Sequence, residues 1–311
     1  MAILVAADFN DDEWAAWWPA LEAALPDEKL VRGGTVEQRS VIDVALVANP
    51  PIGALQGLPQ LRFIQSLWAG VDRLLLDASV PVQVPLARMV DPAMNTAMAE
   101  TALWAVIGLH RRFFHYAAQQ RAAQWQQHAP VRADEISVGV LGLGQMGRAV
   151  AQTLARHGYR VAGWSTSPAL LDGVATSNGE AALHTLLANV HIVVNLLPLT
   201  PATVGLFRAD TLARMRPGAS LVNLARGAHV VEADLLAALG SGHLQHAVLD
   251  VFATEPLPAE HPFWRHDSVT VLPHVAAQTD PRSAARIAAD NVRAHRAGRV
   301  PANLVNRTRG Y

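Results

Sequence analysis

Three side chains that could share acid–base and carboxylate chemistry each follow an apolar run of about five residues in the C-terminal half of the chain. They are Arg226, Glu255 and His274. If the runs are parallel strands of one sheet, their carboxyl ends meet along one edge, and the three side chains should converge there. A guanidinium can hold a carboxylate through two hydrogen bonds, and an imidazolium can protonate a carbonyl oxygen while a neighbouring carboxylate raises its pKa. The trio therefore suits hydride transfer to a 2-oxo acid.

Each member of the trio also has an ordinary structural alternative. Arg226 could form a surface salt bridge, Glu255 could be a solvated loop acid, and His274 could be a hydrogen-bonded histidine at a strand end. Three such coincidences at the strand ends of one domain are much rarer than one. The set as a whole favours a functional site.

A glycine pattern of the kind that binds dinucleotides begins near the middle of the chain. Gly142, Gly144 and Gly147 follow the apolar run 138–141 and precede a helical pattern over 148–157. The first glycine permits a tight turn, the second lets backbone N–H groups approach a pyrophosphate, and the third lets helix pack on strand. The pattern alone is weak, but a strand before it and a helix after it are the expected context. More than a hundred residues precede it, so another folded unit must stand in front of the cofactor site.

The turn that would meet the adenosine ribose carries no acid. A site that prefers NAD(H) is expected to have Asp or Glu about 20 residues beyond the glycine turn, where it accepts hydrogen bonds from the ribose hydroxyls. The second strand of the unit instead reads from Arg160 through Trp164 to Pro168 with no acid at its end, and Ser165, Thr166 and Ser167 stand where the acid is expected. Hydroxyls could bind a 2′-phosphate that an acid would repel. We therefore expect NADP(H) rather than NAD(H).

The elements that position these residues are those of an α/β protein with parallel sheets. Short apolar runs alternate with helical patterns in the first hundred residues, and four more runs follow the glycine unit. The Trp-rich helix is expected to bury its indoles, and the longest helical pattern is long enough to span domains or contact a second subunit. The predicted strands are 3–6, 44–47, 61–66, 192–195, 220–224, 247–251 and 269–272, and the predicted helices are 12–24, 96–126, 209–215, 232–239 and 282–297.

Composition excludes several other classes of protein. The chain has 311 residues, a formal net charge of −1 and no cysteine, so we predict neither a nucleic-acid partner nor a thiolate metal site, and no metal ligand set is assigned. The N-terminus lacks the features of a signal peptide, and no segment approaches the ~20 apolar residues of a membrane span. Lys29 is the only lysine, which excludes dehydrogenases that use a catalytic lysine near the cofactor. A cytoplasmic protein is expected.

Several motifs together resemble the D-isomer-specific 2-hydroxyacid dehydrogenase family, and most closely its glyoxylate/hydroxypyruvate reductase branch. The resemblance covers nearly the whole chain and rests on the glycine turn and four further segments, namely 195–201, 222–227, 249–256 and 273–277. It implies two Rossmann-like or flavodoxin-like domains with doubly wound parallel sheets, the cofactor domain being inserted into the substrate domain. The expected segments are 1–97 and 280–311 for the substrate domain and 98–279 for the cofactor domain.

The resemblance also assigns roles to residues. It implies that Arg226 binds the substrate, that His274 is the acid/base and that Glu255 is its partner, so that hydride from nicotinamide C4 and a proton from His274 reduce glyoxylate or hydroxypyruvate to glycolate or D-glycerate. The loop 66–72 is expected to receive the substrate carboxylate on its backbone N–H groups, although an ordinary strand-to-helix turn is an equal alternative. The substrate-loop residues are Trp68, Ala69 and Gly70, and the expected cofactor contacts are Gly142, Gly144, Gln145, Met146, Gly147, Trp164, Ser165, Thr166, Ser167, Leu197, Pro198, Leu224, Ala225, Arg226, Asp250 and His274.

Family members are usually dimers held by their cofactor domains, so a homodimer is expected. Trp125 resembles in position a tryptophan that reaches a neighbouring subunit's site, although a buried interface residue is the simpler interpretation. Asp250 could position the site or the nicotinamide, or could cap a loop. A sister enzyme for D-lactate, phosphoglycerate or a bulkier acid, and a nucleotide-sensing corepressor on the same fold, are the alternative functions.

Overall fold

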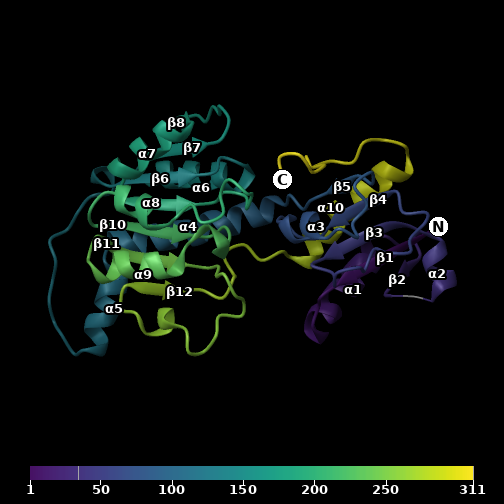
Figure 1. Cartoon of the computed structure of the whole chain (residues 1–311), viewed down its shortest axis with the longest axis horizontal. Coiled ribbons are helices and arrows are strands. Elements are labelled where there is room, and N and C mark those ends of the chain that lie inside the picture. The colour runs from purple at the N-terminus through teal and green to yellow at the C-terminus, as the bar shows by residue number, and fades with distance from the viewer. Residues whose placement is uncertain (34, 311) are drawn as a thin grey trace. The chain divides into compact units, whose positions relative to one another are not determined.

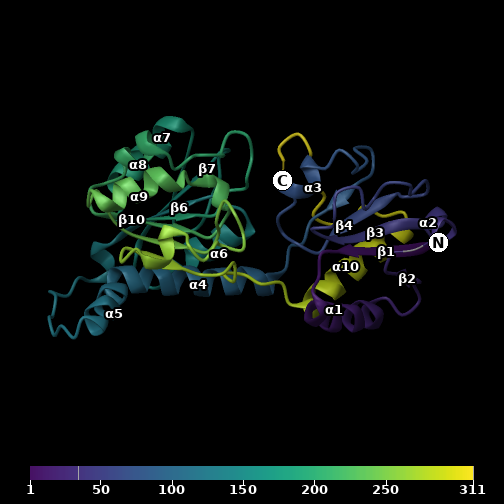
Figure 2. The same ribbon diagram turned by 60° about the horizontal axis from the view of Figure 1, so that its bottom comes forward.

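The computed structural model describes residues 1–33 and 35–310, which form two compact units. The terminal domain consists of Met1–Ala93 and Thr279–Tyr311, of which Tyr311 lies outside the described residues, and the central domain consists of Met94–Gln278. The central domain is thus inserted between two segments of the terminal domain. Figures 1 and 2 show each unit as a layered α/β structure.

The terminal domain has a five-stranded, all-parallel sheet in the order β2-β1-β3-β4-β5. Its first helix begins at a capping box in which Asn10 and Glu13 exchange hydrogen bonds. It buries Trp14 and Trp17 as predicted, but Trp18 is only partly buried. The elements are β1 (Ala2–Ala7), α1 (Asp11–Ala24), β2 (Leu30–Val31), α2 (Val36–Ser40), β3 (Ile42–Ala48), β4 (Phe63–Ser66), α3 (Asp72–Leu76), β5 (Leu86–Ala87) and α10 (Pro281–Arg296).

The C-terminal segment completes the terminal domain. Asn291 on α10 donates to the buried side chain of Gln65 on β4 and accepts from the backbone N–H of Ala302. Leu304 forms an isolated antiparallel bridge with Ala87 at the end of β5. The returning segment is therefore bonded to the sheet at residues more than 200 positions away in sequence.

The central domain has a seven-stranded, all-parallel sheet in the order β12-β11-β10-β9-β6-β7-β8. Two parallel-sheet α/β domains are therefore confirmed. The elements are α4 (Pro92–His110), α5 (Phe113–Arg121), η1 (Ala133–Glu135), β6 (Ser137–Leu141), α6 (Gln145–Arg156), β7 (Arg160–Ser165), β8 (Ala175–Asn178), α7 (Glu180–Asn189), β9 (Ile192–Asn195), α8 (Ala209–Arg214), β10 (Ala219–Asn223), η2 (Gly227–His229), α9 (Glu232–Gly240), β11 (Leu244–Leu249), η3 (Pro262–Arg265) and β12 (Val269–Val271).

Helices cover both faces of the central sheet. Leucines of α7, α8 and α9 pack with one set of strand side chains, and residues of α4 and α6 pack with the other set. Figure 2 shows the first three helices on one side of this sheet and the other two on the opposite side. Because both faces are buried, the strands are continuous apolar runs, which is why they were readable in the sequence.

The single helix predicted over 96–126 is wrong. The structure has two helices, α4 and α5, and the second ends at Arg121. Arg112, between them, has φ 57°, in the left-handed region that no α-helix can continue through. The first of the two helices begins at Pro92, four residues before the predicted start, a position that proline tolerates because the N–H it lacks would have no partner there.

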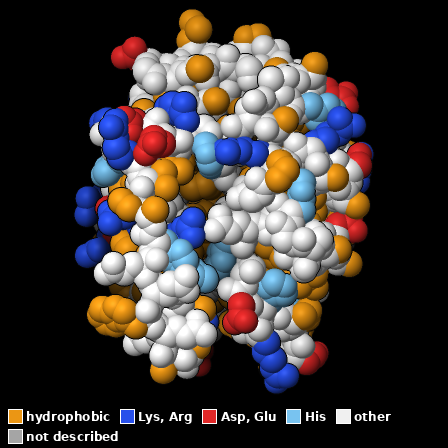
Figure 3. All heavy atoms as spheres, turned by 90° about the vertical axis from the view of Figure 1, so that its left-hand side faces the viewer, with side chains coloured by type: hydrophobic (Ala, Val, Ile, Leu, Met, Phe, Trp, Pro, Cys, Tyr) orange, Lys and Arg blue, Asp and Glu red, His pale blue; other side chains and the backbone are white. Residues whose placement is uncertain are grey.

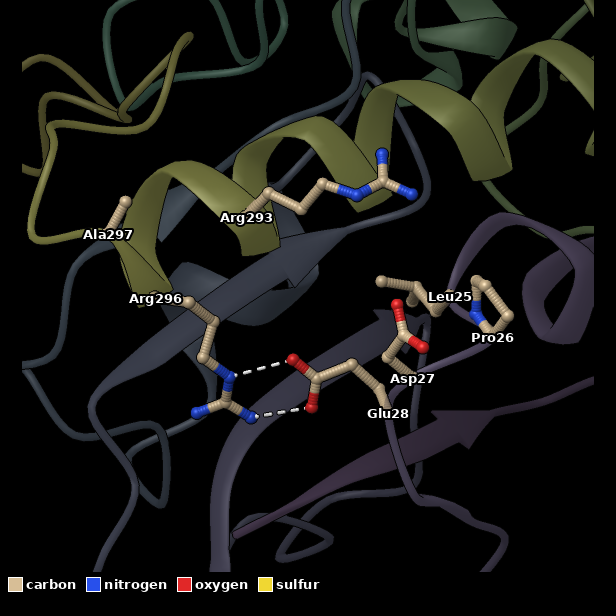
Figure 4. A pocket seen from close by; sticks show the side chains of 7 residues that line it. All are labelled: Leu25, Pro26, Asp27, Glu28, Arg293, Arg296 and Ala297. Atoms are coloured by element: carbon tan, nitrogen blue, oxygen red, sulfur yellow. Dashed lines mark hydrogen bonds and ion pairs between the residues drawn. The ribbon is translucent and has the colours of Figure 1, made fainter.

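A charged hollow lies at the amino-terminal edge of the terminal sheet, and Figure 4 shows its lining. Arg296 near the end of α10 donates to both carboxylate oxygens of Glu28, at 2.9 and 3.0 Å, and also to the carboxylate of Asp43 on β3. The Asp43 side chain is only 8% exposed, and those of Arg296 and Glu28 are 20% and 21% exposed. The triad fastens α10 to the sheet.

In the described part of the chain, no helix is both long enough and apolar enough to cross a membrane.

Candidate functional site

The glycine turn lies where the strand order of the central sheet reverses. β6 pairs with β7 on one side and with β9 on the other, and the chain leaves β6 directly into Gly142. Gly142 has φ 95°, and a Cβ there would lie 2.7 Å from the carbonyl oxygen of Leu196, which follows β9. In open parallel sheets this crevice is where ligands bind.

The three glycines of the turn differ in the space around them. A Cβ on Gly147 would lie 1.7 Å from the carbonyl oxygen of Gly142, so helix α6 can pack on the turn only with glycine there. A Cβ on Gly144, in contrast, would meet nothing within 4 Å. Gly144 caps α6, and the amides of Gln145 and Met146 follow at the helix start. Open space in front of a helix N-terminus fits the pyrophosphate of a dinucleotide.

His274 and Glu255 form a hydrogen-bonded pair at the carboxyl edge of the central sheet. The Nδ1 atom of His274 lies 2.7 Å from Oε2 of Glu255, while Oε1 of the same carboxylate accepts from the backbone N–H of Phe252 at 2.9 Å. The imidazole is 54% exposed, which leaves it accessible. With Nδ1–H donating to Glu255, Nε2 is the nitrogen that can exchange a proton with a substrate.

Arg226 belongs to the same cluster. Its loop is in van der Waals contact with the segment that leads to Glu255, since a Cβ on Gly227 would lie 1.8 Å from the carbonyl carbon of Phe252. Nη1 of Arg226 donates to the carbonyl oxygen of Ala225 at 2.7 Å. The structure thus brings together the three side chains predicted to converge.

Charge within the cluster shifts two pKa values in opposite directions. The hydrogen bond to Glu255 raises the pKa of His274, against the effects of partial burial and of the Arg226 charge. Burial raises the pKa of Glu255, but its hydrogen bonds from His274 and Phe252 and the two positive charges outweigh burial and lower it. Both shifts favour the imidazolium–carboxylate form of the pair.

Asp250 fixes the backbone of the histidine loop. His274 has φ 55°, an uncommon conformation for a residue other than glycine, and its N–H donates to the carbonyl oxygen of Asp250 at 2.9 Å. The buried carboxylate of Asp250 accepts from the N–H groups of Val275 and Ala276 at 2.7 and 3.0 Å. Burial raises the pKa of Asp250, against these hydrogen bonds. The loop-capping alternative is thus realised in the structure.

A buried polar network beneath the strand ends was not singled out from the sequence. The side-chain amide of Asn195 donates to the Asn223 side chain and to Nδ1 of His229, both at 2.9 Å, and its oxygen accepts from Leu197 N–H at 3.3 Å. Asn223 in turn donates to the carbonyl oxygen of Arg226. The network joins the loop after β9 to the loop after β10. Its sequence signal was an asparagine ending each of two apolar strands.

The turn after β7 presents hydroxyl groups. Trp164 is buried and its indole N–H donates to the carbonyl oxygen of Gly179, whereas Thr166 and Ser167 are exposed. The Ser165 hydroxyl donates to the carbonyl oxygen of Ser167 at 2.6 Å, which closes the turn. The remaining expected contacts, Leu197, Pro198, Leu224 and Ala225, lie at the carboxyl ends of β9 and β10.

In the terminal domain, the loop that follows β4 is anchored by its own serine. Ser66 Oγ accepts from Trp68 N–H at 3.1 Å and donates to the Trp68 carbonyl oxygen, and the indole of Trp68 packs against Phe9 and Trp17. Within residues 1–33 and 35–310, no hydrogen bond is recorded for the N–H groups of Ala69 and Gly70. Within the described loop, these two amides and that of Val71 next to them are the ones for which no bond is recorded, so an anion could bind there.

The fold and the strand-end cluster define a class: a two-domain α/β protein with a dinucleotide turn and an Arg–Glu–His trio at one sheet edge. Comparison with known proteins narrows that class. Residues 103–276 match the profile described as D-isomer specific 2-hydroxyacid dehydrogenase, NAD binding domain. Glyoxylate/hydroxypyruvate reductase A of Serratia proteamaculans is 42% identical over 308 residues, which cover 97% of each chain. The chain belongs to the D-isomer specific 2-hydroxyacid dehydrogenase family.

Solved structures agree with this assignment. A D-isomer specific 2-hydroxyacid dehydrogenase from Xanthobacter autotrophicus, crystallised with NADPH and MES, has a TM-score of 0.93 and 41% identity, and the match covers 100% of this chain and 99% of that chain. An NADPH-dependent glyoxylate/hydroxypyruvate reductase from Sinorhizobium meliloti, crystallised with NADP and sulfate, has a TM-score of 0.93 and 33% identity with the same coverage.

Proposed function

We propose that this chain is an NADPH-dependent reductase that converts glyoxylate and hydroxypyruvate into glycolate and D-glycerate. The observation that carries the proposal is the His274–Glu255 pair beside Arg226, at the same sheet edge as the glycine turn. Relatives of this length are named for the same reaction, and related structures hold NADPH or NADP.

The residues divide the work of reduction. Bound NADPH would supply the hydride. Arg226 binds the substrate carboxylate and polarises the adjacent carbonyl, because a guanidinium can donate two parallel hydrogen bonds. His274, held charged by Glu255, donates its Nε2 proton to the carbonyl oxygen as the alcohol forms. Asp250 acts through the backbone, by holding the histidine loop in place.

The loop that follows β4 in the terminal domain is proposed to bind a carboxylate through its backbone N–H groups. The amides of Ala69 and Gly70 suit this role because the N–H of Trp68 is already bonded to Ser66. Trp68 then contributes through its indole, which anchors the loop against the aromatic side chains of the terminal domain. This refines the expectation that three amides act together.

We also propose a homodimer formed through the central domain. This domain exposes Trp125 at 94%, Phe113 at 51% and Trp104 at 44%, values unusual for aromatic side chains that face only water. Figure 3 shows hydrophobic side chains exposed among histidine, basic and acidic side chains on the face turned toward the viewer. Sedimentation equilibrium should give twice the chain mass of 33.3 kDa, and a monomer at micromolar concentration would refute this part of the proposal.

The reaction is tested with purified protein and a panel of four 2-oxo acids: glyoxylate, hydroxypyruvate, pyruvate and phenylpyruvate. Initial rates with NADPH and with NADH should show the largest kcat/KM for NADPH with glyoxylate or hydroxypyruvate. A tenfold preference for NADH would overturn the cofactor assignment. Tight nucleotide binding without turnover of any acid would overturn the reaction and favour a nucleotide sensor.

A further inference from the structure

The turn expected to face a 2′-phosphate has hydroxyl groups but no positive charge. Ser165 uses its proton to bond the carbonyl oxygen of Ser167, and in the described part of the chain no hydrogen bond is recorded for the hydroxyls of Thr166 and Ser167. A phosphate carries close to two negative charges, and hydrogen bonds from charged donors are about twice as strong as neutral ones. A cation from elsewhere in the fold would complete this subsite.

Arg148 lies where such a cation is needed. It is in the first turn of α6, and its partly buried side chain reaches in two directions. Nε donates to the carbonyl oxygen of Leu143 in the glycine turn at 3.1 Å, and Nη1 donates to the carbonyl oxygen of Leu170 at 2.8 Å. The guanidinium therefore bridges the glycine turn and the segment that follows β7. In this fold the adenosine half of a dinucleotide lies over these two segments.

The positive charge of Arg148 is held in place without being neutralised. Among residues 1–33 and 35–310, both of its recorded hydrogen bonds go to carbonyl oxygens, and no ion pair is recorded for it, Asp172 in the following segment included. Three exposed arginines of this chain behave differently. Arg132, Arg208 and Arg282 each form an ion pair with an aspartate two residues away.

We propose that Arg148 is the residue that recognises the 2′-phosphate of NADP(H), with the hydroxyls of Thr166 and Ser167 as neutral donors beside it. This inference rests on the proposed NADPH-dependent function and names the residue that sets its cofactor preference. NADH has a hydroxyl in place of the phosphate, so the guanidinium charge contributes little to binding NADH. The arginine acts from the helix after the glycine turn rather than from the turn after β7.

The test compares wild-type protein with Arg148→Gln, which removes the charge and keeps a long polar side chain. We expect kcat/KM for NADPH to fall about 10- to 100-fold, the range for losing a hydrogen bond to a charged group, while kcat/KM for NADH changes less than threefold. Calorimetry with the protein alone gives a readout without turnover. The affinity for adenosine 2′,5′-bisphosphate should fall by a similar factor, and the affinity for 5′-AMP should stay within threefold.

Two further variants separate the loss of charge at Arg148 from a loosening of the loop. Arg148→Lys retains a charge, so it should restore part of the preference for the bisphosphate even if glutamine loosens the loop. Arg156→Gln removes the same charge from the far end of α6, about 12 Å along the helix, and should leave both affinities unchanged. If Arg148→Gln lowers the affinities for adenosine 2′,5′-bisphosphate and 5′-AMP equally, the arginine only holds the two segments together, and the inference is overturned. If wild-type protein reduces no 2-oxo acid, the proposed function fails, and the calorimetric comparison still decides the role of Arg148.

Discussion

Two edges of the two sheets carry clusters of charged side chains, and their partners differ. At the amino-terminal edge of the terminal sheet, Arg296 is bonded to two carboxylates. At the carboxyl-terminal edge of the central sheet, Arg148 is bonded to carbonyl oxygens, and the imidazole of His274 is accessible beside Glu255. Carboxylates bind the arginine of the first cluster, whereas in the described residues the recorded hydrogen bonds of Arg148 all go to carbonyl oxygens, and His274 stays accessible although it is paired with Glu255.

A hollow is a weaker indicator of function than the charge balance of its lining. The hollow beside Arg296 has a volume of about 410 Å³, yet its arginine is already saturated by Glu28 and Asp43. An anionic ligand there would have to displace a carboxylate. The strand-end cluster presents donors that an anion can use directly. We therefore expect variants at the carboxyl-terminal edge to lose catalysis and variants at the amino-terminal edge to lose stability.

The largest effect is expected for His274→Ala. Without the proton donor, kcat for glyoxylate reduction should fall about 10³-fold, within the range for general acid catalysis, while NADPH affinity measured by calorimetry stays within threefold. The matched control is His261→Ala, which removes a different histidine of the same domain, bonded to Glu232 at 3.3 Å. Its kcat should stay near that of wild type. Near-normal turnover by His274→Ala would show that the carboxyl-terminal edge of the central sheet does not supply the proton donor.

Arg226→Ala should lower kcat/KM for glyoxylate about 10²- to 10³-fold, through a higher KM as well as a lower kcat. The reason is that the substrate carboxylate loses hydrogen bonds to a charged donor in both the ground state and the transition state. Arg208→Ala, which removes an exposed arginine paired with Asp210, is the control and should change neither constant. An unchanged KM in Arg226→Ala would contradict the assigned role.

At the other edge, Arg296→Met should reduce stability and spare catalysis. Removing the arginine leaves Glu28 and Asp43 close together without their cation, which we expect to cost about 2 to 4 kcal/mol of unfolding free energy. Arg293→Met, on the same helix, loses an exposed pair to Asp290 and a hydrogen bond to the carbonyl oxygen of Ala24, and should cost less than Arg296→Met, about 1 kcal/mol. Urea unfolding followed by tryptophan fluorescence measures both. A loss of kcat at full folding in Arg296→Met would show that the amino-terminal edge also serves the reaction.

The sequence was sufficient for features that depend on local pattern. Buried parallel strands appear as apolar runs, and the topology of such sheets then brings Arg226, Glu255 and His274 to one edge, which is why their convergence could be predicted. The glycine turn could also be predicted, because two of its own residues, Gly142 and Gly147, have no room for a side chain.

Features that depend on contacts between distant segments could not be predicted. The break at Arg112 requires a left-handed residue that nothing in the local sequence demands. The two-residue strands β2 and β5 exist only through their pairing with β1 and β4. His229 was hidden for the same reason, because its partner Asn195 lies 34 positions away. Nothing in the local sequence marks Arg148, because its partner Leu170 lies 22 positions away.

The smallest and most specific effect is expected in the pH profile of Glu255→Gln. Reduction requires protonated His274, and the hydrogen bond to Glu255 raises the pKa of that imidazole, so wild-type kcat/KM should be level at low pH and fall as pH rises through the raised pKa. The variant loses the carboxylate charge while partial burial and Arg226 still act to lower this pKa. Its descending limb should therefore shift to lower pH by about 1 unit, the lower end of the range for losing an adjacent opposite charge.

The reverse reaction gives an independent check on this shift. Oxidation of the 2-hydroxy acid needs neutral His274, so its rate should rise with pH, and the midpoint of that rise should move to lower pH in Glu255→Gln by the same amount. Glu260→Gln, at an exposed carboxyl five residues further on, should move neither midpoint. Coincident profiles for Glu255→Gln and wild type would mean that the carboxylate only orients the ring and does not raise the pKa of His274.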